Sequence, residues 1–404
     1  MDTLPSGTLS SFQPIVGMRD FSPSELKSRN KVIDSVGNLL SANGFEMADY
    51  PIIEPTELFV KKSGGDSGGR LYSFIDPGGN RVSLRPEFTS SVIRSFLLEG
   101  SPSVGIRRQY AGSVFRYSDG ERTNEVKEFT QIGCELIGSE SIQSDIQILR
   151  LALQAVSKTL VPSVVVRMGN IGLIRALLAG YGLNETICFY VLSNLSTLRS
   201  GSLSSIELVE RAAELGLVSD SKEIDESYTD LSDQESINDF LSQDLTGNTG
   251  RRSRSDIINR LIAKENTKVD SGSLSKAIDQ LILFLKIVEE KQDLDSLSDI
   301  GNDFGNEVQE KIDELNSVIK GVGNVEPLSV NYVLDFSTSR GLTYYTGLIF
   351  DISLNHLDHT VVGGGGRYDG LVKMLGGSED VPAVGFAINV DSLLSSVNSP
   401  DSTA

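Results

Sequence analysis

The sequence predicts an α+β protein in which an antiparallel sheet is flanked by helices and interrupted by a helical insertion. Strand-like segments follow one another with short turns in residues 1–170 and again in 325–404. Residues 171–324 instead show the apolar spacing of amphipathic helices. Consecutive strands with helices to one side are typical of antiparallel α+β domains. We therefore expect one core domain, formed by the two outer ranges, with the middle range inserted into it.

The first helix has clear signals at both ends. Ser22 can cap it, Pro23 suits the first helical position, and Glu25 completes a capping box. The pair Asn43-Gly44 is typical of a helix end, so we expect a helix over residues 24–43.

A strand, a hairpin and a strand-to-helix junction follow. Phe45–Glu54 is rich in strand-forming residues, and Pro51 indicates an edge strand. Leu71–Ile75 and Arg81–Leu84 flank a Pro-Gly-Gly turn, which predicts a hairpin. The segment 84–97 then passes from strand into helix.

The remaining core elements alternate in the same way. We expect strands at Ser113–Tyr117, Lys127–Leu136 and Ser163–Met168, with a helix from Ser144 to about Leu160. Strand-like texture returns at 328–336.

The C-terminal stretch combines a strand, four glycines and several tyrosines. Alternation predicts a strand over Arg340–Ile352, a short helix over Gly370–Leu375 and a buried strand over 384–388. The glycine run 363–366 lets the backbone approach a ligand or another strand closely. Alone, this stretch is equally consistent with a ligand pocket and with a glycine-rich hairpin that packs its tyrosines.

Composition restricts the function classes. The net charge of −19 repels a phosphate backbone, which argues against tRNA or another nucleic acid as a partner. No apolar run reaches the length of a membrane span, and the polar N-terminus shows no export signal, so we expect a cytoplasmic protein. The acidic segment 221–250 is interpreted as a solvated surface or loop.

Cysteine and histidine give no cofactor signal. Cys134 and Cys188 are far apart and fit neither a disulfide framework nor a metal site. His356 and His359 stand three apart without further ligand spacing, so we expect no metal and no cofactor.

Polar side chains on several separate segments point to a small-molecule site. Carboxylate, amide and tyrosine hydroxyl groups suit the ammonium and polar side chain of an amino acid, and arginines suit a carboxylate or phosphate. The candidate residues are Arg85, Glu87, Thr89, Arg116, Gln131, Glu135, Arg340, Tyr344, Tyr345 and Tyr368.

These segments resemble the histidyl-tRNA synthetase family of class II aminoacyl-tRNA synthetases. The resemblance is carried by GMRDFSP, PIIEPTELF, LRPEFTSS, SVFRY, EFTQIGCELIG, RGLTYYTGLIFD, GGGGRYDGLV and VPAVGFAI, and it covers nearly the whole chain except the acidic middle. It implies a class II synthetase-like sheet of six or more strands and a homodimer formed through the first helix and the Pro51 strand.

Several positions depart from the synthetase pattern. The sequence ends eleven residues after Leu393, so we expect no anticodon-binding domain. Ser392 stands where the family has an arginine that grips the ATP phosphates, and Phe88 and Thr343 replace a glycine and an aspartate. The loop after Arg116 should carry a glutamate near Ser118 and several basic residues; it reads SDGERTNEVKEF, with Glu125 where a basic residue is expected.

This combination is similar to ATP phosphoribosyltransferase regulatory subunits, which are synthetase paralogues without the anticodon domain. That resemblance implies a non-catalytic subunit that joins a short-form catalytic ATP phosphoribosyltransferase in the first step of histidine biosynthesis and takes part in its feedback regulation. It implies a homodimer within a hetero-oligomer and no catalytic residue of its own. The histidine-binding residues would be Glu87, Thr89, Gln131, Glu135, Tyr344, Tyr345 and Tyr368.

Other interpretations stay open at this stage. Arg116 and Arg340 would lie near the histidine carboxylate or a vestigial nucleotide site, and both also suit a working histidine–tRNA ligase that lacks its anticodon domain. A third possibility is an amino-acid-sensing or RNA-binding paralogue with another partner.

Overall fold

A computed structural model of the chain describes ten stretches of the sequence. These are residues 13–62, 71–100, 105–117, 126–159, 161–219, 268–291, 297–298, 301–336, 344–354 and 360–397. The expectations for Arg340, Thr343, the loop residue Glu125, His356, His359 and the acidic segment 221–250 concern positions outside these described residues.

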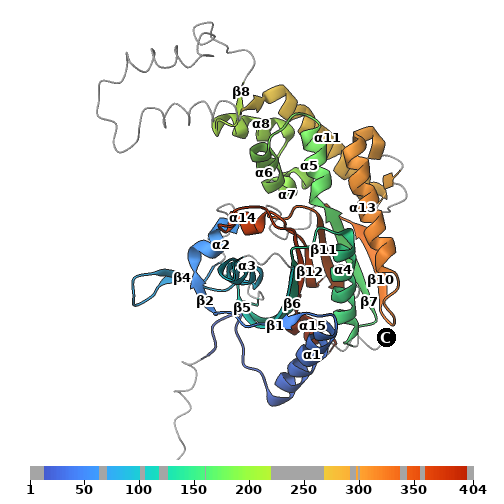
Figure 1. Cartoon of the computed structure of the whole chain (residues 1–404). Coiled ribbons are helices and arrows are strands. Elements are labelled where there is room, and N and C mark those ends of the chain that lie inside the picture. Colours follow the sequence, from blue (N-terminus) through green and yellow to red (C-terminus); the bar gives the residue numbers. More distant parts are fainter. Residues whose placement is uncertain are drawn as a thin grey trace, which may run out of the picture. The chain divides into compact units, whose positions relative to one another are not determined.

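The chain divides into two compact units (Figure 1). One comprises Met1–Gly172, Gln292–Asp299 and Glu310–Ala404, and the other comprises Leu173–Lys291 and Ile300–Gln309. The inserted unit therefore ends before the expected boundary at residue 324. The reason is that the helix continuing to Val322 is tied to the first unit, where Arg150 Nε donates to the Val322 carbonyl at 3.0 Å.

The first unit is built on one large mixed sheet. Its strand order is β1-β5-β6-β13-β12-β11-β7-β10, and a smaller sheet has the order β2-β4-β3. The strands are β1 (Glu46–Met47), β2 (Ile53–Pro55), β3 (Ser73–Ile75), β4 (Arg81–Leu84), β5 (Ile106–Phe115), β6 (Glu128–Ile137), β7 (Ser163–Asn170), β10 (Ser329–Leu334), β11 (Leu348–Leu354), β12 (Val361–Arg367) and β13 (Ala383–Asn389).

Helices cover both faces of the large sheet. The helices of this unit are α1 (Pro23–Ala42), α2 (Thr56–Lys62), α3 (Thr89–Leu98), α4 (Ile142–Ser157), α14 (Leu371–Met374), α15 (Val390–Val397) and the part of α13 (Asn306–Val322) that begins at Glu310. On one face α1, α4 and α15 pack together, and Arg29 of α1 donates to Thr130 of β6 at 3.2 Å. α3 lies on the other face, where Thr89 at its start donates to Glu135 of β6.

The predicted class is confirmed, with a refinement at the sheet edges. The central pairs are antiparallel, whereas the edge pairs β1–β5 and β7–β10 are parallel. The capping box of α1 is present, since Ser22 and Glu25 exchange backbone-to-side-chain hydrogen bonds of 2.8 and 3.3 Å.

Two predicted strands are wrong in extent. Phe45–Glu54 is not one strand: β1 joins the large sheet and β2 the small sheet, and Pro51 between them has no N–H to continue a ladder. Within the strand predicted over Arg340–Ile352, the described residues 344–347 are not strand, and β11 runs from Leu348. The residues just before it bond elsewhere, and Thr346 N donates to the Arg367 carbonyl at 2.8 Å.

The second unit is mainly helical in its described part. Its elements are α5 (Ile171–Ala179), which begins in the first unit, α6 (Glu185–Ser193), α7 (Leu195–Arg199), α8 (Ser205–Glu214), α11 (Ser271–Lys291), the 3₁₀ helix η2 (Gly301–Phe304), and the parallel pair β8 (Val218–Ser219) and β9 (Val269–Asp270). One apolar face of α11 is buried, including Ile278 and Leu281, as the amphipathic spacing of this range predicts. No described helix of either unit is both long enough and apolar enough to span a bilayer.

Candidate functional site

Glu135 lies at the centre of a buried polar cluster on β6. Only 1% of the residue is exposed, and its Oε1 accepts from Thr89 Oγ1 at 2.7 Å and from Tyr110 OH at 3.1 Å. Tyr368 OH donates to the other oxygen, Oε2. Three hydroxyl groups from α3, β5 and the turn after β12 therefore converge on one carboxyl group.

Burial changes the acidity of this cluster. It raises the pKa of Glu135 from 4.5 to about 7, although the hydrogen bonds from Tyr368, Thr89 and Tyr110 act against that rise. Burial also raises the pKa of both tyrosine hydroxyls well above 10, so they remain protonated donors. Near neutral pH the cluster can therefore exchange a proton at Glu135 only.

Glu87 lies just before α3 and carries a cationic partner. Lys62 Nζ is 3.3 Å from Glu87 Oε2, and Ser90 donates to Glu87 from both its amide and its hydroxyl. Burial alone would raise the pKa of Glu87. The Lys62 ammonium and the Ser90 hydrogen bonds outweigh burial and lower that pKa. Glu87 is thus ionised at neutral pH, whereas the pKa of Glu135 is about 7.

The tyrosines predicted for the site gather beside this pair. The Tyr344 and Tyr345 ring centroids are 4.3 Å apart, and the Tyr368 ring lies 6.2 and 6.5 Å from them. Lys62 Nζ lies 4.1 Å from the centroid of the Tyr344 ring. Aromatic faces and carboxylates are the two groups that favour a bound ammonium.

Gln131 faces the same side of β6 as Glu135. The two are four positions apart on one strand, so their side chains share a face. Gln131 is 6% exposed, and among the described residues its Oε1 accepts no hydrogen bond. A buried amide oxygen without a donor is costly unless a ligand or water supplies one. This atom marks a place for an N–H or O–H donor.

Phe88 fills the interior next to these groups. Its ring stacks on Tyr110 with centroids 4.4 Å apart, and the Arg85 guanidinium lies 4.0 Å from its centroid. Arg85 is held by the backbone, since it donates to the carbonyls of Tyr50 and Ser113 at 2.5 and 2.9 Å. The Phe88 side chain thus belongs to the core and fills the volume next to Tyr110 and Glu135.

The glycine run does not form an open floor. A Cβ at Gly365 would lie 2.0 Å from the Gly385 carbonyl, and one at Gly366 would lie 2.3 Å from the Leu348 carbonyl. Gly365 and Gly366 are therefore required by the close approach of the neighbouring strands β13 and β11, as in the strand alternative raised for this segment.

Arg116 lies at the end of β5 and is exposed. Its Nε donates to the Pro86 carbonyl at 3.2 Å, and its guanidinium is 5.0 Å from the centroid of the Phe129 ring. Phe129 shares the β6 face of Gln131 and Glu135, so Arg116 covers the outer end of that face.

Ser392 lies on α15 and lines a hollow of about 330 Å³. The hollow is also lined by Arg19, Phe21, Glu25, Ser28, Val126, Glu128, Asn389, Asp391, Leu394 and Ser395. Its charged residues are one arginine and three carboxylates, and the Arg19 guanidinium is already paired with Glu25 at 2.6 Å. This net negative lining disfavours a triphosphate.

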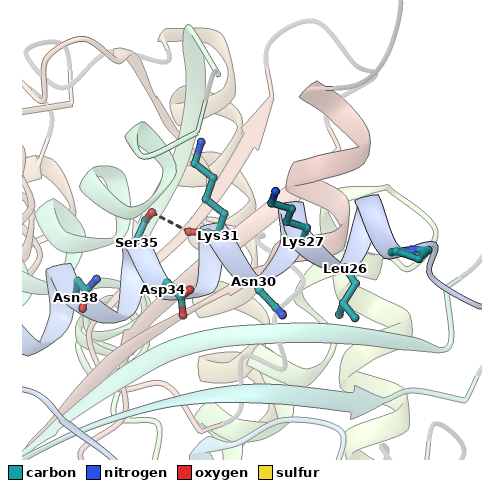
Figure 2. A pocket seen from close by; sticks show the side chains of 8 residues that line it. Leu26, Lys27, Asn30, Lys31, Asp34, Ser35 and Asn38 are labelled. Carbon is teal, nitrogen blue, oxygen red and sulfur yellow. Dashed lines mark hydrogen bonds between the residues drawn. The ribbon is translucent and has the colours of Figure 1, made fainter.

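A second hollow, of about 580 Å³, runs along the outer side of α1 (Figure 2). It is lined by Pro23, Leu26, Lys27, Asn30, Lys31, Asp34, Ser35 and Asn38. None of the predicted ligand residues lies in it.

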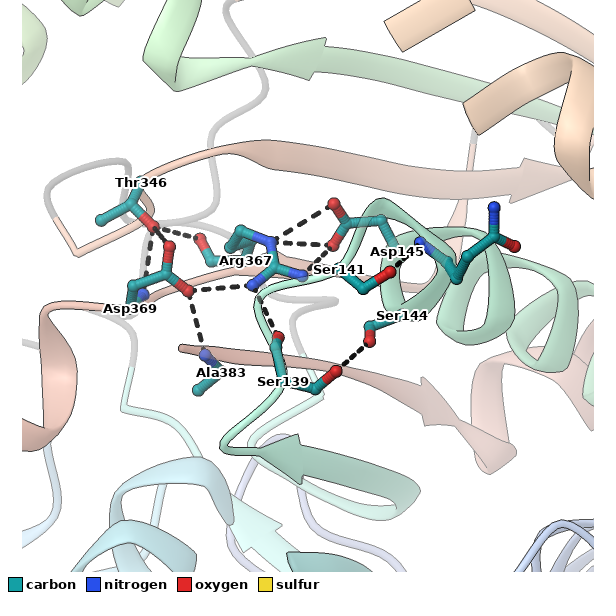
Figure 3. A network of polar contacts seen from close by, with 9 residues as sticks. Ser139, Ser141, Ser144, Asp145, Thr346, Arg367, Asp369 and Ala383 are labelled. Carbon is teal, nitrogen blue, oxygen red and sulfur yellow. Dashed lines mark hydrogen bonds and ion pairs between the residues drawn. The ribbon is translucent and has the colours of Figure 1, made fainter. Parts of the chain in front are cut away.

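Arg367 anchors the turn that carries Tyr368 (Figure 3). Its Nε is 3.0 Å from Asp145 Oδ1, and its Nη1 donates to Asp369 Oδ1 at 3.1 Å and to the Ser139 carbonyl at 3.2 Å. Asp369 in turn accepts from Thr346 Oγ1 at 3.1 Å and from the Ala383 amide at 2.9 Å. This network fixes β12 against α4 and β13 and so holds Tyr368 toward Glu135.

The structure brings most of the predicted site residues to one face of the sheet. Thr89 and Tyr368 both donate to Glu135. Glu87 accepts from Ser90 and pairs with Lys62, whose ammonium also lies over the Tyr344 ring, and Tyr345 adjoins Tyr344. Sequence reasoning missed Tyr110 and Lys62. Strand alternation places Tyr110 opposite Gly133 on the same face, but Lys62 ends a helix and had no local signal.

Among the described residues no group of histidine, cysteine and carboxylate side chains has the arrangement of a metal site. The cluster instead offers a carboxyl that titrates near neutrality, an ionised carboxylate, an unsatisfied amide oxygen and aromatic walls.

The family profile and the most similar relatives reported below both point to the histidyl-tRNA synthetases. The sequence profile of the histidyl-tRNA synthetases matches residues 17–246 and 241–393. The chain is similar to the histidine–tRNA ligase of Sulfurisphaera tokodaii, at 29% identity over 94% of this chain and 74% of that protein. The histidine–tRNA ligase of Methanococcus vannielii is 26% identical over 96% of this chain and 76% of that protein.

Solved structures share the fold. An ATP phosphoribosyltransferase regulatory subunit/histidyl-tRNA synthetase from Bacillus halodurans superposes with a TM-score of 0.62 at 20% identity, covering 98% of this chain and 85% of that chain. A histidyl-tRNA synthetase from Nostoc gives a TM-score of 0.57 at 19% identity, covering 96% and 75%.

Proposed function

Because the chain belongs to the histidyl-tRNA synthetase family, we propose that it is a non-catalytic, histidine-binding regulatory subunit of ATP phosphoribosyltransferase. In this role it binds a short-form catalytic subunit and makes that enzyme's activity responsive to histidine. The proposal has two parts, a weakened nucleotide site and a retained amino-acid pocket.

The observation that carries the proposal is the surroundings of Ser392. The family resemblance places a phosphate-gripping arginine at this position, and serine has no positive charge to replace it. The hollow beside Ser392 is lined by Glu25, Glu128 and Asp391, and its Arg19 is paired with Glu25. Three carboxylates and one paired arginine repel a triphosphate, which argues against ATP activation.

The amino-acid pocket rests on the Glu135 cluster. A histidine imidazole carries one N–H donor and one acceptor nitrogen. Glu135 accepts from the N–H when it is ionised and donates to the acceptor nitrogen when it is protonated, while the hydroxyls of Tyr110 and Tyr368 already donate to Glu135 itself. The Gln131 oxygen, which has no partner among the described residues, accepts from a donor of the ligand. Glu87 beside Tyr344 suits the ammonium group.

Regulation follows if histidine binds two states of the complex with different affinity. A ligand shifts a partner's activity only through such a difference, and the coupling is reciprocal. If histidine changes the affinity of this chain for its partner, the partner changes the affinity of this chain for histidine by the same factor.

The test is reconstitution with a short-form catalytic subunit. The two proteins are mixed, analysed by size-exclusion chromatography, and titrated with L-histidine by calorimetry. We expect a stable complex whose histidine affinity differs from that of the free chain. Absence of any complex at micromolar concentrations contradicts the proposal.

A second candidate is histidine–tRNA ligase activity. The curated relatives at 26–29% identity carry that name, and Arg116 remains at the end of β5. Histidine-dependent exchange between ATP and pyrophosphate separates the two candidates. We expect no exchange above background; turnover that depends on histidine favours the ligase.

A further inference from the structure

Lys62 is an unusual residue in this cluster because it is a buried cation. It is the last residue of α2, it is 8% exposed, and its ammonium is directed at two predicted ligand residues. Nζ lies 3.3 Å from Glu87 Oε2 and 4.1 Å from the Tyr344 ring centroid. The neighbouring Lys61 is exposed and has no such environment.

The surroundings of the Lys62 ammonium are those of a small cation subsite. A carboxylate supplies charge and hydrogen bonds, and the face of an aromatic ring supplies a second attraction. The ammonium of a free amino acid has the same charge, size and donors as the lysine Nζ. Both cations cannot occupy the subsite at once, because they would overlap and repel each other.

Lys62 is also placed to leave this position. Its ammonium is carried on a flexible four-carbon stem, so it can swing away without unfolding the backbone. It stands at the C-terminal end of α2, where the helix dipole stabilises a positive charge in either position. α2 packs against α3, the helix that carries Thr89, and against α14.

We propose that Lys62 occupies the ammonium subsite of the pocket in the free protein, so that an incoming amino acid must displace it. The proposal rests on the proposed function, since it takes Glu87 and Tyr344 to be part of an amino-acid pocket. Lys62 then competes with the ligand's ammonium and lowers the affinity of the pocket for an amino acid.

The experiment compares two variants and three probes by isothermal titration calorimetry. Lys62→Met removes the charge but keeps a similar stem, and Lys61→Met is the matched control. The probes are L-histidine, histidinol, which lacks the carboxylate, and imidazolepropionic acid, which lacks the ammonium.

We expect Lys62→Met to bind L-histidine and histidinol roughly tenfold more tightly than the unchanged protein. In the variant the ligand's ammonium enters the subsite without first breaking the charge-assisted contact between Lys62 and Glu87. Imidazolepropionic acid gains nothing, and Lys61→Met behaves like the unchanged protein. If Lys62→Met weakens L-histidine and imidazolepropionic acid but spares histidinol, Lys62 binds the carboxylate and the proposal is wrong. Equal L-histidine affinity in both proteins also overturns it.

Failure of the proposed function gives a different result. If no probe binds either the unchanged protein or a variant, the pocket itself and the Lys62 proposal both fall. Should Lys62→Met fail to fold by circular dichroism, Lys62→Gln, which can still donate to Glu87 without a charge, takes its place with the same expected direction.

Discussion

Gly385 of β13 lies directly against Glu135 of β6, so that a Cβ at Gly385 would be only 1.6 Å from Glu135 Oε2. The same Cβ would lie 2.6 Å from the Cys134 carbonyl. The glycine therefore creates the space in which the buried carboxyl meets its three hydroxyl donors.

Gly385→Ala is expected to destabilise the protein by roughly 3 kcal/mol, because backbone and a buried carboxyl must both move. Urea unfolding followed by circular dichroism measures the change. Gly370→Ala is the control, since its Cβ would have no neighbour closer than 3.8 Å and its φ is −77°. Equal stability of the two variants would show that Glu135 is not confined as described.

The raised pKa of Glu135 gives a pH prediction. Its folded-state pKa is about 7, against 4.5 when unfolded, so the folded state binds the extra proton between these values. Stability from this group therefore falls as pH rises from about 4.5 to about 7, by roughly 1–3 kcal/mol. Glu135→Gln should remove that part of the slope in unfolding experiments at pH 5, 6 and 7. The exposed control Glu57→Gln should keep it. An unchanged slope in Glu135→Gln would refute the assignment.

Phe88 is expected to behave as a core residue. It is fully buried and stacks on Tyr110, so Phe88→Ala should cost about 3–5 kcal/mol of unfolding free energy. Phe74→Ala, at a half-exposed position, should change stability by about 0.5 kcal/mol or less. A loss of less than about 1 kcal/mol for Phe88→Ala would mean that the ring is replaceable by solvent.

Arg367 should not tolerate lysine. One ammonium cannot contact Asp145, Asp369 and the Ser139 carbonyl together, so Arg367→Lys should cost about 2 kcal/mol or more. Lys373→Met breaks the exposed pair with Asp380 and should change stability by less than about 0.5 kcal/mol. Thermal unfolding compares the two, and a matching small effect at Arg367 would contradict its anchoring role.

The sequence correctly predicted the elements that depend on residues close together in the chain. The capping box at Ser22 and Glu25 and the hairpin around residues 76–79 depend on neighbours in the chain, and both formed. The strand expected over Phe45–Glu54 failed because its two halves join different sheets. That division depends on partners far away in the sequence.

In the candidate site, too, local motifs were predicted and contacts between distant segments were not. Glu87, Thr89 and Glu135 were selected from motifs, and the structure places them together, although their roles as ligands stay predictions. The Lys62–Glu87 pair joins positions 25 apart through a helix end and a strand-to-helix junction, which no periodicity encodes. The glycine run was equally consistent with a ligand floor and with strand packing, and only the register with β13 separates the two.

If this chain regulates a catalytic partner through histidine, it changes the turnover of that partner. The most direct measurement is the rate at which a short-form ATP phosphoribosyltransferase consumes ATP and phosphoribosyl pyrophosphate, with and without this chain and with added L-histidine. We predict that the chain raises the rate and that histidine lowers it again only when the chain is present. A rate that is the same with and without the chain, at every histidine concentration, would show that the chain does not regulate the enzyme.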